Sequence, residues 1–417
     1  MNVAILTLGT LGDVQPYVAL GAGLKAAGHE VTLVTGRGFE AMVSGRGLRY
    51  VPLNVDLLPA RVRAVEGGQG RAPVPERRLA RGARADARNA QGLDGRVGGG
   101  GFAGRGRHRY HPKAMGGYHV AEALGVPGFL ALPVPALSPT GAFPVPVLPL
   151  PNLGAALNRL SYGTFFRSLT LPYRPMVNQW RERTLGLTAL PLRASELELR
   201  GEPIVRLYPC SPTVVPVPAD WDGSSAMTGN WFLDQGKDWR PPDELAAFLR
   251  DGPPPVYVGF GTAAPDPEGS RASAFAALRR LGLRGVLATG RHGMADPEII
   301  EIEGAPHDWL FPRMAAVAHH GGAGTTAEGL RAGRPTAVFP SNFGDQLFWG
   351  RRVRALGMGP EPVPQKRLTI ERLTAAIRAV TEDEGARRRA EELGERVRGE
   401  DGVARAVELI ERAFAER

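Results

Sequence analysis

The segment between residues 307 and 328 carries the clearest chemical signal. His-His-Gly-Gly-Ala-Gly-Thr-Thr at 319–326 follows a short apolar run, and the pattern predicts a helix over Thr325–Ala332. Glycines before a helix let a ligand approach its free amides, and the helix dipole favours an anion there. A glycine turn alone is a weak signal, but His320 and Glu328 strengthen it. We therefore expect a diphosphate site.

Asp13 is the second candidate. It lies in Gly-Thr-Leu-Gly-Asp at 9–13, directly after the apolar run Val3–Leu8, which is typical of a buried parallel strand. A carboxylate in a glycine-bounded loop can accept a proton from a hydroxyl group. It can equally cap the helix that we expect from Pro16 to Ala27. The residues alone leave both roles open.

The elements that must position these residues alternate between strands and helices, which predicts parallel sheets with helices on both faces. In the first half we expect strands at 3–8, 31–34 and 128–132 and helices at 16–27, 118–124 and within 157–185. In the second half we expect strands at 256–260, 286–289, 316–319 and 336–339 and helices at 243–249, 272–281, 325–332 and 402–414.

The chain length of 417 residues suits two domains. Recurrent prolines at 209–222 predict the linker. We expect an N-terminal Rossmann-like domain over 1–215, a C-terminal one over 216–395, and a final helix over 396–417 that packs back. The predicted fold class is α/β, with two doubly wound parallel-sheet domains facing each other across a cleft, and ligands near the strand carboxyl ends.

The net charge of +9 raises the question of nucleic-acid binding. Between Arg61 and Arg109 the chain has twelve arginines, four acidic residues and one aromatic residue, Phe102, so this block holds nearly all of the excess. A nucleic-acid surface would distribute basic residues over folded elements with aromatics between them. We expect no nucleic-acid partner.

The block 61–109 also fits neither half in composition. Arginine, glycine and alanine dominate, and Gly98–Gly101 form a run of four glycines. Too little apolar surface is present to offset the entropy of ordering, so one interpretation is a disordered insertion. The other is a stretch of GC-rich DNA read out of frame. Resequencing the gene distinguishes them.

The single cysteine, Cys210, forms no internal disulfide, and no secretion signal precedes the first strand. Prolines interrupt the most hydrophobic stretch, so no segment reaches the roughly 20 residues of a membrane-spanning helix. We therefore expect a cytoplasmic protein. Peripheral membrane contact stays open if the ligand is a lipid, and the sequence leaves the oligomeric state undetermined.

Four segments resemble the nucleotide-sugar glycosyltransferases with two Rossmann-like domains (GT-B fold). The similarity is closest to the branch of sterol 3-beta-glucosyltransferases and antibiotic-aglycone glycosyltransferases. It rests on GTLGDVQP at 9–16, on YHPKAMGGYHVAEALGVP at 110–127, on VYVGFGT at 256–262, and on 307–350 with HHGGAGTT and GDQLFWG. The block 61–109 does not take part.

The resemblance implies a UDP- or TDP-sugar as substrate, with no cofactor. Its diphosphate would be held by His320, by the loops at Gly12 and Gly261-Thr262, and by the amides of Gly322, Ala323, Gly324 and Thr325. Glu328 would accept hydrogen bonds from the ribose, and Asp345-Gln346 would bind the sugar hydroxyls. The nucleobase would lie against Ile302-Glu303.

In related enzymes the aspartate that matches Asp13 is the general base of an inverting transfer. The related loops read Gly-Thr-Arg-Gly-Asp, so Leu11 replaces a cation here, and this departure could lower activity. No metal is implied, because no carboxylate cluster has ligand spacing.

The acceptor should be apolar. The stretch 130–153 with Phe143, and the helix that contains Tyr162 and Phe166, would line its site. Each assignment has a structural alternative: these apolar side chains, His320, Glu328 and Asp345-Gln346 also suit packing, helix surfaces or turns.

The main hypothesis is a hexosyltransferase that moves a hexose, with glucose favoured, onto a sterol or polyketide aglycone. Two alternatives remain: an inactive nucleotide-sugar-binding homologue, favoured by Leu11 and the 61–109 block, and a two-domain sugar-nucleotide epimerase. Release of nucleoside diphosphate that depends on an acceptor would separate the transferase from both.

Overall fold

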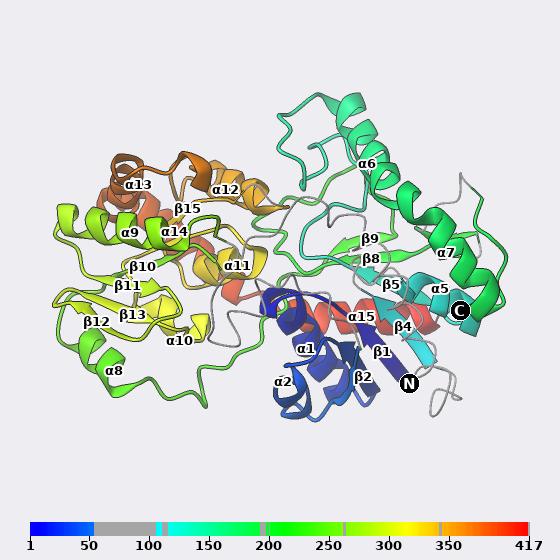
Figure 1. Cartoon of the computed structure of the whole chain (residues 1–417). Helices are drawn as coiled ribbons and strands as arrows, with labels where there is room; N and C mark the ends of the chain where they lie inside the picture. Colours follow the sequence, from blue (N-terminus) through cyan, green and yellow to red (C-terminus); the bar gives the residue numbers. More distant parts are fainter. Residues whose placement is uncertain are drawn as a thin grey trace.

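The structure is a computed structural model that describes residues 1–53, 106–110, 116–191, 197–199, 201–261, 264–341 and 344–415, with the backbone alone at 106–110. Within these residues, two mainly parallel sheets form the centres of two α/β halves, and helices cover their faces (Figure 1). The predicted α/β class with two doubly wound sheets is confirmed.

The first sheet has strand order β3-β2-β1-β4-β5-β8-β9 in the described part of the chain. Its strands are β1 (Asn2–Leu6), β2 (Glu30–Thr35), β3 (Arg49–Pro52), β4 (Gly106–Tyr110), β5 (Gly128–Ala131), β8 (Val205–Tyr208) and β9 (Ser225–Met227). The helices of this half are α1 (Leu11–Ala26), α2 (Glu40–Ser44), α5 (Gly116–Leu124), α6 (Ala155–Thr170) and α7 (Arg174–Trp180). A small hairpin, β6 (Glu198–Leu199) with β7 (Glu202–Pro203), lies outside the sheet.

The second sheet has strand order β12-β13-β11-β10-β14-β15, and only β12 runs antiparallel to its neighbour within the described residues. Its strands are β10 (Val256–Gly259), β11 (Gly285–Ala288), β12 (Gly293–Asp296), β13 (Ile299–Ile302), β14 (Ala316–His319) and β15 (Thr336–Val338). The helices of this half and the C-terminus are α8 (Asp243–Arg250), α9 (Pro267–Leu281), α10 (His307–Leu310), α11 (Ala323–Arg331), α12 (Gln346–Ala355), α13 (Ile370–Glu382), α14 (Glu384–Arg398) and α15 (Gly402–Ala415).

The helix α1 begins five residues before the predicted start at Pro16. Its N-terminus is set by Thr10 and Asp13, which form a capping box, and Pro16 falls inside the helix. Proline cannot donate to the carbonyl four residues earlier, but near a helix N-terminus few intrahelical bonds are lost. The capping residues therefore outweigh the proline as the start signal.

The strand β4 corrects the expectation for the block 61–109. Gly106–Tyr110 pairs in parallel with β1 along its whole length and also with β5, so the end of this block is a central strand of the first sheet. Backbone pairing on both sides orders a strand whatever its composition. The rest of the block lies outside the described residues, and the question of the reading frame stays a prediction.

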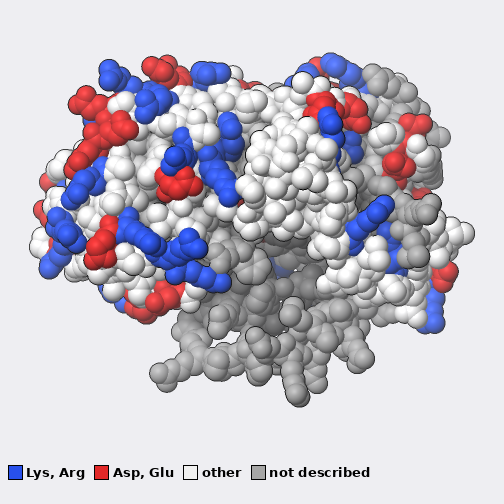
Figure 2. Space-filling view, turned by 90° about the horizontal axis from the view of Figure 1, so that it is seen from above, with Lys and Arg blue, Asp and Glu red and all other residues white. Residues whose placement is uncertain are grey.

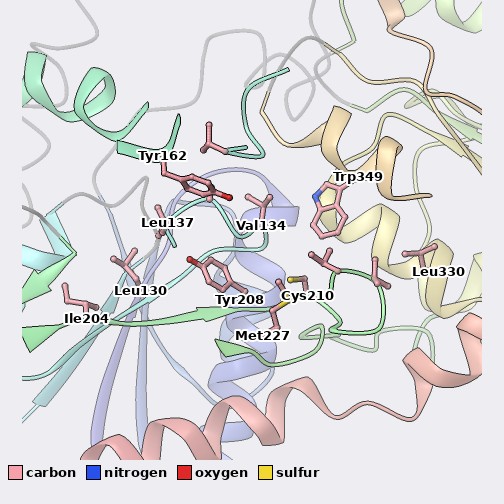
Figure 3. Packing of buried hydrophobic residues seen from close by; sticks show 14 of the residues in the cluster. Leu130, Val134, Leu137, Tyr162, Ile204, Tyr208, Cys210, Met227, Leu330 and Trp349 are labelled. Carbon is pink, nitrogen blue, oxygen red and sulfur yellow. The ribbon is translucent and has the colours of Figure 1, made fainter. Parts of the chain in front are cut away.

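The two halves share a hydrophobic core. Leu130, Val134 and Tyr208 from the first half belong to one buried cluster with Leu330 and Trp349 from the second, as Figure 3 shows. The strand β9 belongs to the first sheet and lies beyond residue 215, where we expected that domain to end.

The last helix, α15, returns to the first half and lies along the first sheet (Figure 1). Its apolar face carries Val407 and Ile410, which are buried among side chains of β1 and α1. The ring centroid of Phe414 lies 5.1 Å from that of Phe129 on β5. Burial of this face fixes the position of the helix.

Candidate functional site

The glycine turn between β14 and α11 has a strained backbone that its neighbours hold in place. Gly321 has φ +88°, and a Cβ atom there would lie 2.7 Å from Val338, so only glycine fits. The buried ring of His319 accepts a hydrogen bond at Nδ1 from the Gly321 amide, over 2.9 Å. His319 therefore shapes the turn.

The N-terminus of α11 is open. Gly322 is the N-cap residue, and no side chain caps the helix. The first backbone N–H groups of a helix have no intrahelical partner, so amides here can bind an anion in the direction of the helix dipole. Among the predicted amide donors, Gly324 is exposed and Gly322, Ala323 and Thr325 are half-buried.

His320 lies between two glycines at this N-terminus. A Cβ atom on Gly261 would lie 2.9 Å from its ring, and one on Gly322 would lie 2.6 Å from Nε2. Burial lowers the pKa of His320, and a hydrogen bond with the Gly259 backbone partly opposes this shift. A neutral imidazole still has one N–H to donate. Thr262, the other predicted residue in this loop, lies outside the described residues.

Glu328, two turns into α11, is an unusual carboxyl group. Burial raises its pKa to about 7, with Asp308 and Asp234 adding to the rise and Arg331 opposing it. The Arg331 guanidinium lies 3.8 Å from the Glu328 carboxylate and forms a shorter ion pair with Asp234. A carboxyl group whose ionisation is opposed by burial is a feature of binding and catalytic sites.

Asp345 and Gln346 lie at the start of α12, and both have intramolecular partners. The indole Nε1 of Trp349 donates to Asp345 Oδ2 over 2.7 Å. Gln346 Oε1 accepts from both the backbone N–H and the hydroxyl of Ser341, each over 2.8 Å. These bonds fix the orientation of both side chains.

Trp349 is a residue whose role we did not predict. Its ring is buried in the core that the two halves share. It also orients Asp345 through the hydrogen bond described above. The sequence could have indicated this contact, because residues four positions apart lie on the same face of a helix.

Asp13 lies in the first turn of α1. Its Oδ2 accepts from the Thr10 amide over 2.9 Å and from the Thr10 hydroxyl over 3.1 Å. Gly9 is required beside it, because φ is +140° and a Cβ atom would lie 2.1 Å from Oδ2. The capping role that the sequence left open is thus present. Gly12 and Leu11 are exposed on the same turn.

The helices α1 and α11, which carry the two candidate sites, contact each other. The segment 232–234 lies between them: Gln15 of α1 donates to the Leu233 carbonyl, and Arg331 of α11 lies over the Phe232 ring. This segment therefore links α1 of the first half to α11 of the second.

Of the predicted acceptor residues, Phe143 and Phe166 are half-buried, whereas Tyr162 is 1% exposed. The Phe143 ring lies 5.9 Å from that of Phe348 on α12, so it is close to the second half. The Tyr162 hydroxyl donates to the Phe143 carbonyl over 3.3 Å. Tyr162 thus supports the segment that carries Phe143 and contributes packing.

A cavity of about 320 Å³ lies in the second half. Ile302 and Glu303, against which we expected the nucleobase, line it together with Gly304, Leu245 and Trp239. Its walls combine aromatic and aliphatic side chains with polar ones, among them Arg240 and His292, which suits a planar ring that carries hydrogen-bonding groups.

Two negative findings concern metals and membranes. In the residues that the structure describes, no group of three His, Cys, Asp or Glu side chains is arranged to hold a metal ion. The described helices include none with the length and apolar character needed to cross a bilayer.

Family models match both halves of the chain. Residues 3–138 match the glycosyltransferase family 28 N-terminal domain, and residues 293–407 match the erythromycin biosynthesis protein CIII-like C-terminal domain.

Curated relatives align with nearly the whole chain. A sterol 3-beta-glucosyltransferase of Emericella nidulans is 36% identical over 99% of this chain and 30% of its own length. A sterol 3-beta-glucosyltransferase of Arabidopsis thaliana is 34% identical over 99% of this chain and 68% of its own. The chain thus spans less than a third of the fungal relatives that it matches.

Solved structures show the same fold. The glycosyltransferase of kitacinnamycin superposes with a TM-score of 0.73 at 19% identity, covering 99% of this chain and 98% of its own. The glycosyltransferase VinC in complex with dTDP superposes with a TM-score of 0.67 at 18% identity over the full length of both chains. With its two Rossmann-like sheets and the relatives above, the chain belongs to the GT-B glycosyltransferases, in the family that includes the sterol 3-beta-glucosyltransferases.

Proposed function

We propose that this protein is an inverting glycosyltransferase that moves a hexose, with glucose favoured, from a UDP- or TDP-sugar to a hydroxyl group of an apolar acceptor such as a sterol or polyketide aglycone. The observation that carries the proposal is that α11, whose N-terminus has no side-chain cap, contacts α1, which bears Asp13. One terminus suits the leaving diphosphate, and the other bears a base.

The donor would bind to the second half. Its diphosphate would accept hydrogen bonds from the first amides of α11 and from the ring of His320, and Gly261 allows that ring its position. Glu328 would accept hydrogen bonds from the ribose hydroxyls, and Asp345 with Gln346 would bind the sugar. The nucleobase would enter the cavity at Ile302-Glu303.

The transfer itself would need one base and one anion site. The acceptor hydroxyl would give its proton to the Asp13 carboxylate while its oxygen bonds to the anomeric carbon. The bond from that carbon to the diphosphate oxygen would break on the opposite face, and the leaving group would keep the electron pair. The α11 amides would stabilise the new negative charge.

The acceptor would approach from the first half, where Phe143 and Phe166 are half-buried and Tyr162 holds the Phe143 segment. The curated relatives support a sterol, because they carry sterol 3-beta-glucosyltransferase names at 34–36% identity. A cytoplasmic location fits the buried, free thiol of Cys210.

The test is incubation of the purified protein with UDP-glucose or TDP-glucose and a panel of sterols and polyketide aglycones, read by mass spectrometry. We expect a glycoside from the wild type and none from His320→Ala. An acceptor-independent change of the sugar would instead indicate an epimerase. Donor binding without turnover on any acceptor would indicate a binding homologue.

A further inference from the structure

Exposed leucines gather on and around α6. Of the twelve large apolar side chains that stay exposed in the described part of the chain, six lie between residues 148 and 171. They are Leu148, Leu153, Leu157, Leu160, Leu169 and Leu171. Monomeric soluble proteins scatter such residues, so a cluster of this size indicates an interaction surface.

The helix presents these leucines outward because its other side is anchored. Asn158 is fully buried, and its side-chain amide donates to the Gly141 carbonyl and to Asn152. Tyr162, one turn later, is also buried. On the opposite side, Leu157 and Leu160 are 52% and 61% exposed. The helix thus exposes apolar side chains on its outer face while its inner face is held in place.

The stretch of sequence that carries this surface has basic but no acidic residues. Between residues 125 and 181 the sequence contains four arginines and neither aspartate nor glutamate. On α6 itself, Arg159 and Arg167 are both exposed. Arg159 forms an ion pair with Asp220 over 2.6 Å, which leaves Arg167 as the arginine of this helix for an anionic partner. Figure 2 looks down on the side of the molecule where α6 lies in Figure 1 and shows a broad uncharged surface with charged groups at its borders. Leucines that insert, beside arginines that reach headgroups, are typical of helices that lie in a membrane interface.

We propose that the outer face of α6 together with its flanking residues, defined by Leu153, Leu157, Leu160, Arg167 and Leu171, docks this protein on an anionic phospholipid bilayer. The leucines would enter the acyl boundary, and Arg167 would bind lipid phosphate. The exposed Arg167 and the lack of acidic residues between 125 and 181 match a negatively charged membrane, and the exposed leucines match its acyl boundary. The inner face of the same helix carries Phe166, so docking would bring the region proposed for the acceptor close to the membrane.

The experiment is co-sedimentation of the full chain with vesicles of phosphatidylglycerol and phosphatidylcholine, and with vesicles of phosphatidylcholine alone. We expect the wild type to bind the anionic vesicles and the double variant Leu157→Ser, Leu160→Ser to bind them about tenfold more weakly. Arg167→Glu should weaken binding to the anionic vesicles about fivefold and leave binding to the neutral ones unchanged.

The control is Met294→Ser, which removes a 44% exposed side chain from β12 in the other half and should bind like the wild type. Unchanged UDP affinity would show that each variant is folded, and vesicle binding needs no acceptor, so failure here is distinct from failure of the transferase proposal. Equal sedimentation with and without vesicles would overturn the docking proposal. A wild-type dimer that the double variant converts to a monomer, with no vesicle binding, would assign the face to a second copy instead.

Discussion

The first turns of α1 and α11 each follow directly after a parallel strand, β1 in the first half and β14 in the second, but their amides are satisfied differently. At α1 the Asp13 carboxylate accepts a hydrogen bond from the Thr10 amide, so the protein supplies the anion. At α11 the N-cap residue is Gly322, and no side chain takes that place. A glycine at the N-cap costs roughly a few tenths of a kcal/mol relative to a capping side chain, so an open terminus is tolerated here. In the proposed function, the α11 terminus binds the diphosphate of the donor, whereas the α1 terminus already holds a carboxylate.

The largest effect should come from Asp13→Asn. An asparagine oxygen still accepts from Thr10, so the cap persists, but the side chain no longer takes up a proton. We expect kcat to fall by a factor of about 10²–10⁴ with little change in Tm. Asp13→Ala should lose the cap too and with it about 1 kcal/mol of stability. A variant Asp13→Asn with nearly normal turnover would leave capping as the whole role of this residue.

A capping side chain at the N-terminus of α11 should have the next largest effect. Gly322→Asp would place a capping carboxylate on α11, and its Cβ atom would displace the His320 ring, which lies 2.6 Å away. We expect UDP to bind about 10- to 100-fold more weakly, by calorimetry, because a negative charge replaces the ligand and the imidazole moves.

The matched control for Gly322→Asp is Gly223→Asp, which adds the same charge in the first half, where a Cβ atom meets no neighbour within 4 Å. It should leave UDP affinity unchanged. If the two variants bind UDP equally well, the diphosphate does not lie at the α11 terminus.

The buried carboxyl group of Glu328 on α11 should make the stability of the protein depend on pH. The folded pKa of Glu328, about 7, is above its ordinary value of 4.5, so this group stabilises the fold least when it is ionised. As pH rises from 4.5 to 7, its unfavourable contribution should grow and then stay constant. Glu328→Gln should therefore be more stable than the wild type by about 2 kcal/mol at pH 8 and not at pH 4, in urea titrations.

The same Glu328→Gln variant should bind UDP about fivefold more weakly, because the amide accepts less strongly from ribose hydroxyls. Glu395→Gln, on an exposed position of α14, is the control and should change neither quantity. A loss of stability at pH 8 in Glu328→Gln would show that the ion pair with Arg331 outweighs desolvation.

The smallest effect should come from adding a positive charge at the N-terminus of α1. Leu11 is 50% exposed at the first position of α1, so Leu11→Arg can be accommodated without repacking. A cation beside the region of the diphosphate should lower the KM for the donor about fivefold. Leu11→Gln, neutral and of similar length, should leave KM unchanged, and an equal effect of both would exclude a charge interaction.

Much of the fold follows from local pattern. Continuous apolar runs and glycine stops indicated β1, β2, β10 and β14 within one or two residues, because a strand buried on both faces must be apolar throughout. The C-terminal helix was equally clear from its apolar face. The start of α1 was less clear, since Pro16 is a stronger signal in the sequence than the two-residue capping box.

The residue types at the site, and the glycines around them, were determined by the sequence itself: an open glycine turn before α11 and a carboxylate after the first strand. Their states were decided only by the tertiary structure. The pKa of Glu328 depends on Asp308 and Asp234, which are 20 and 94 positions away in the chain. The orientation of Tyr162, buried beneath the Phe143 segment, depends on packing between α6 and a distant loop. Desolvation and packing are properties of groups that only folding brings together, so no local pattern can contain them.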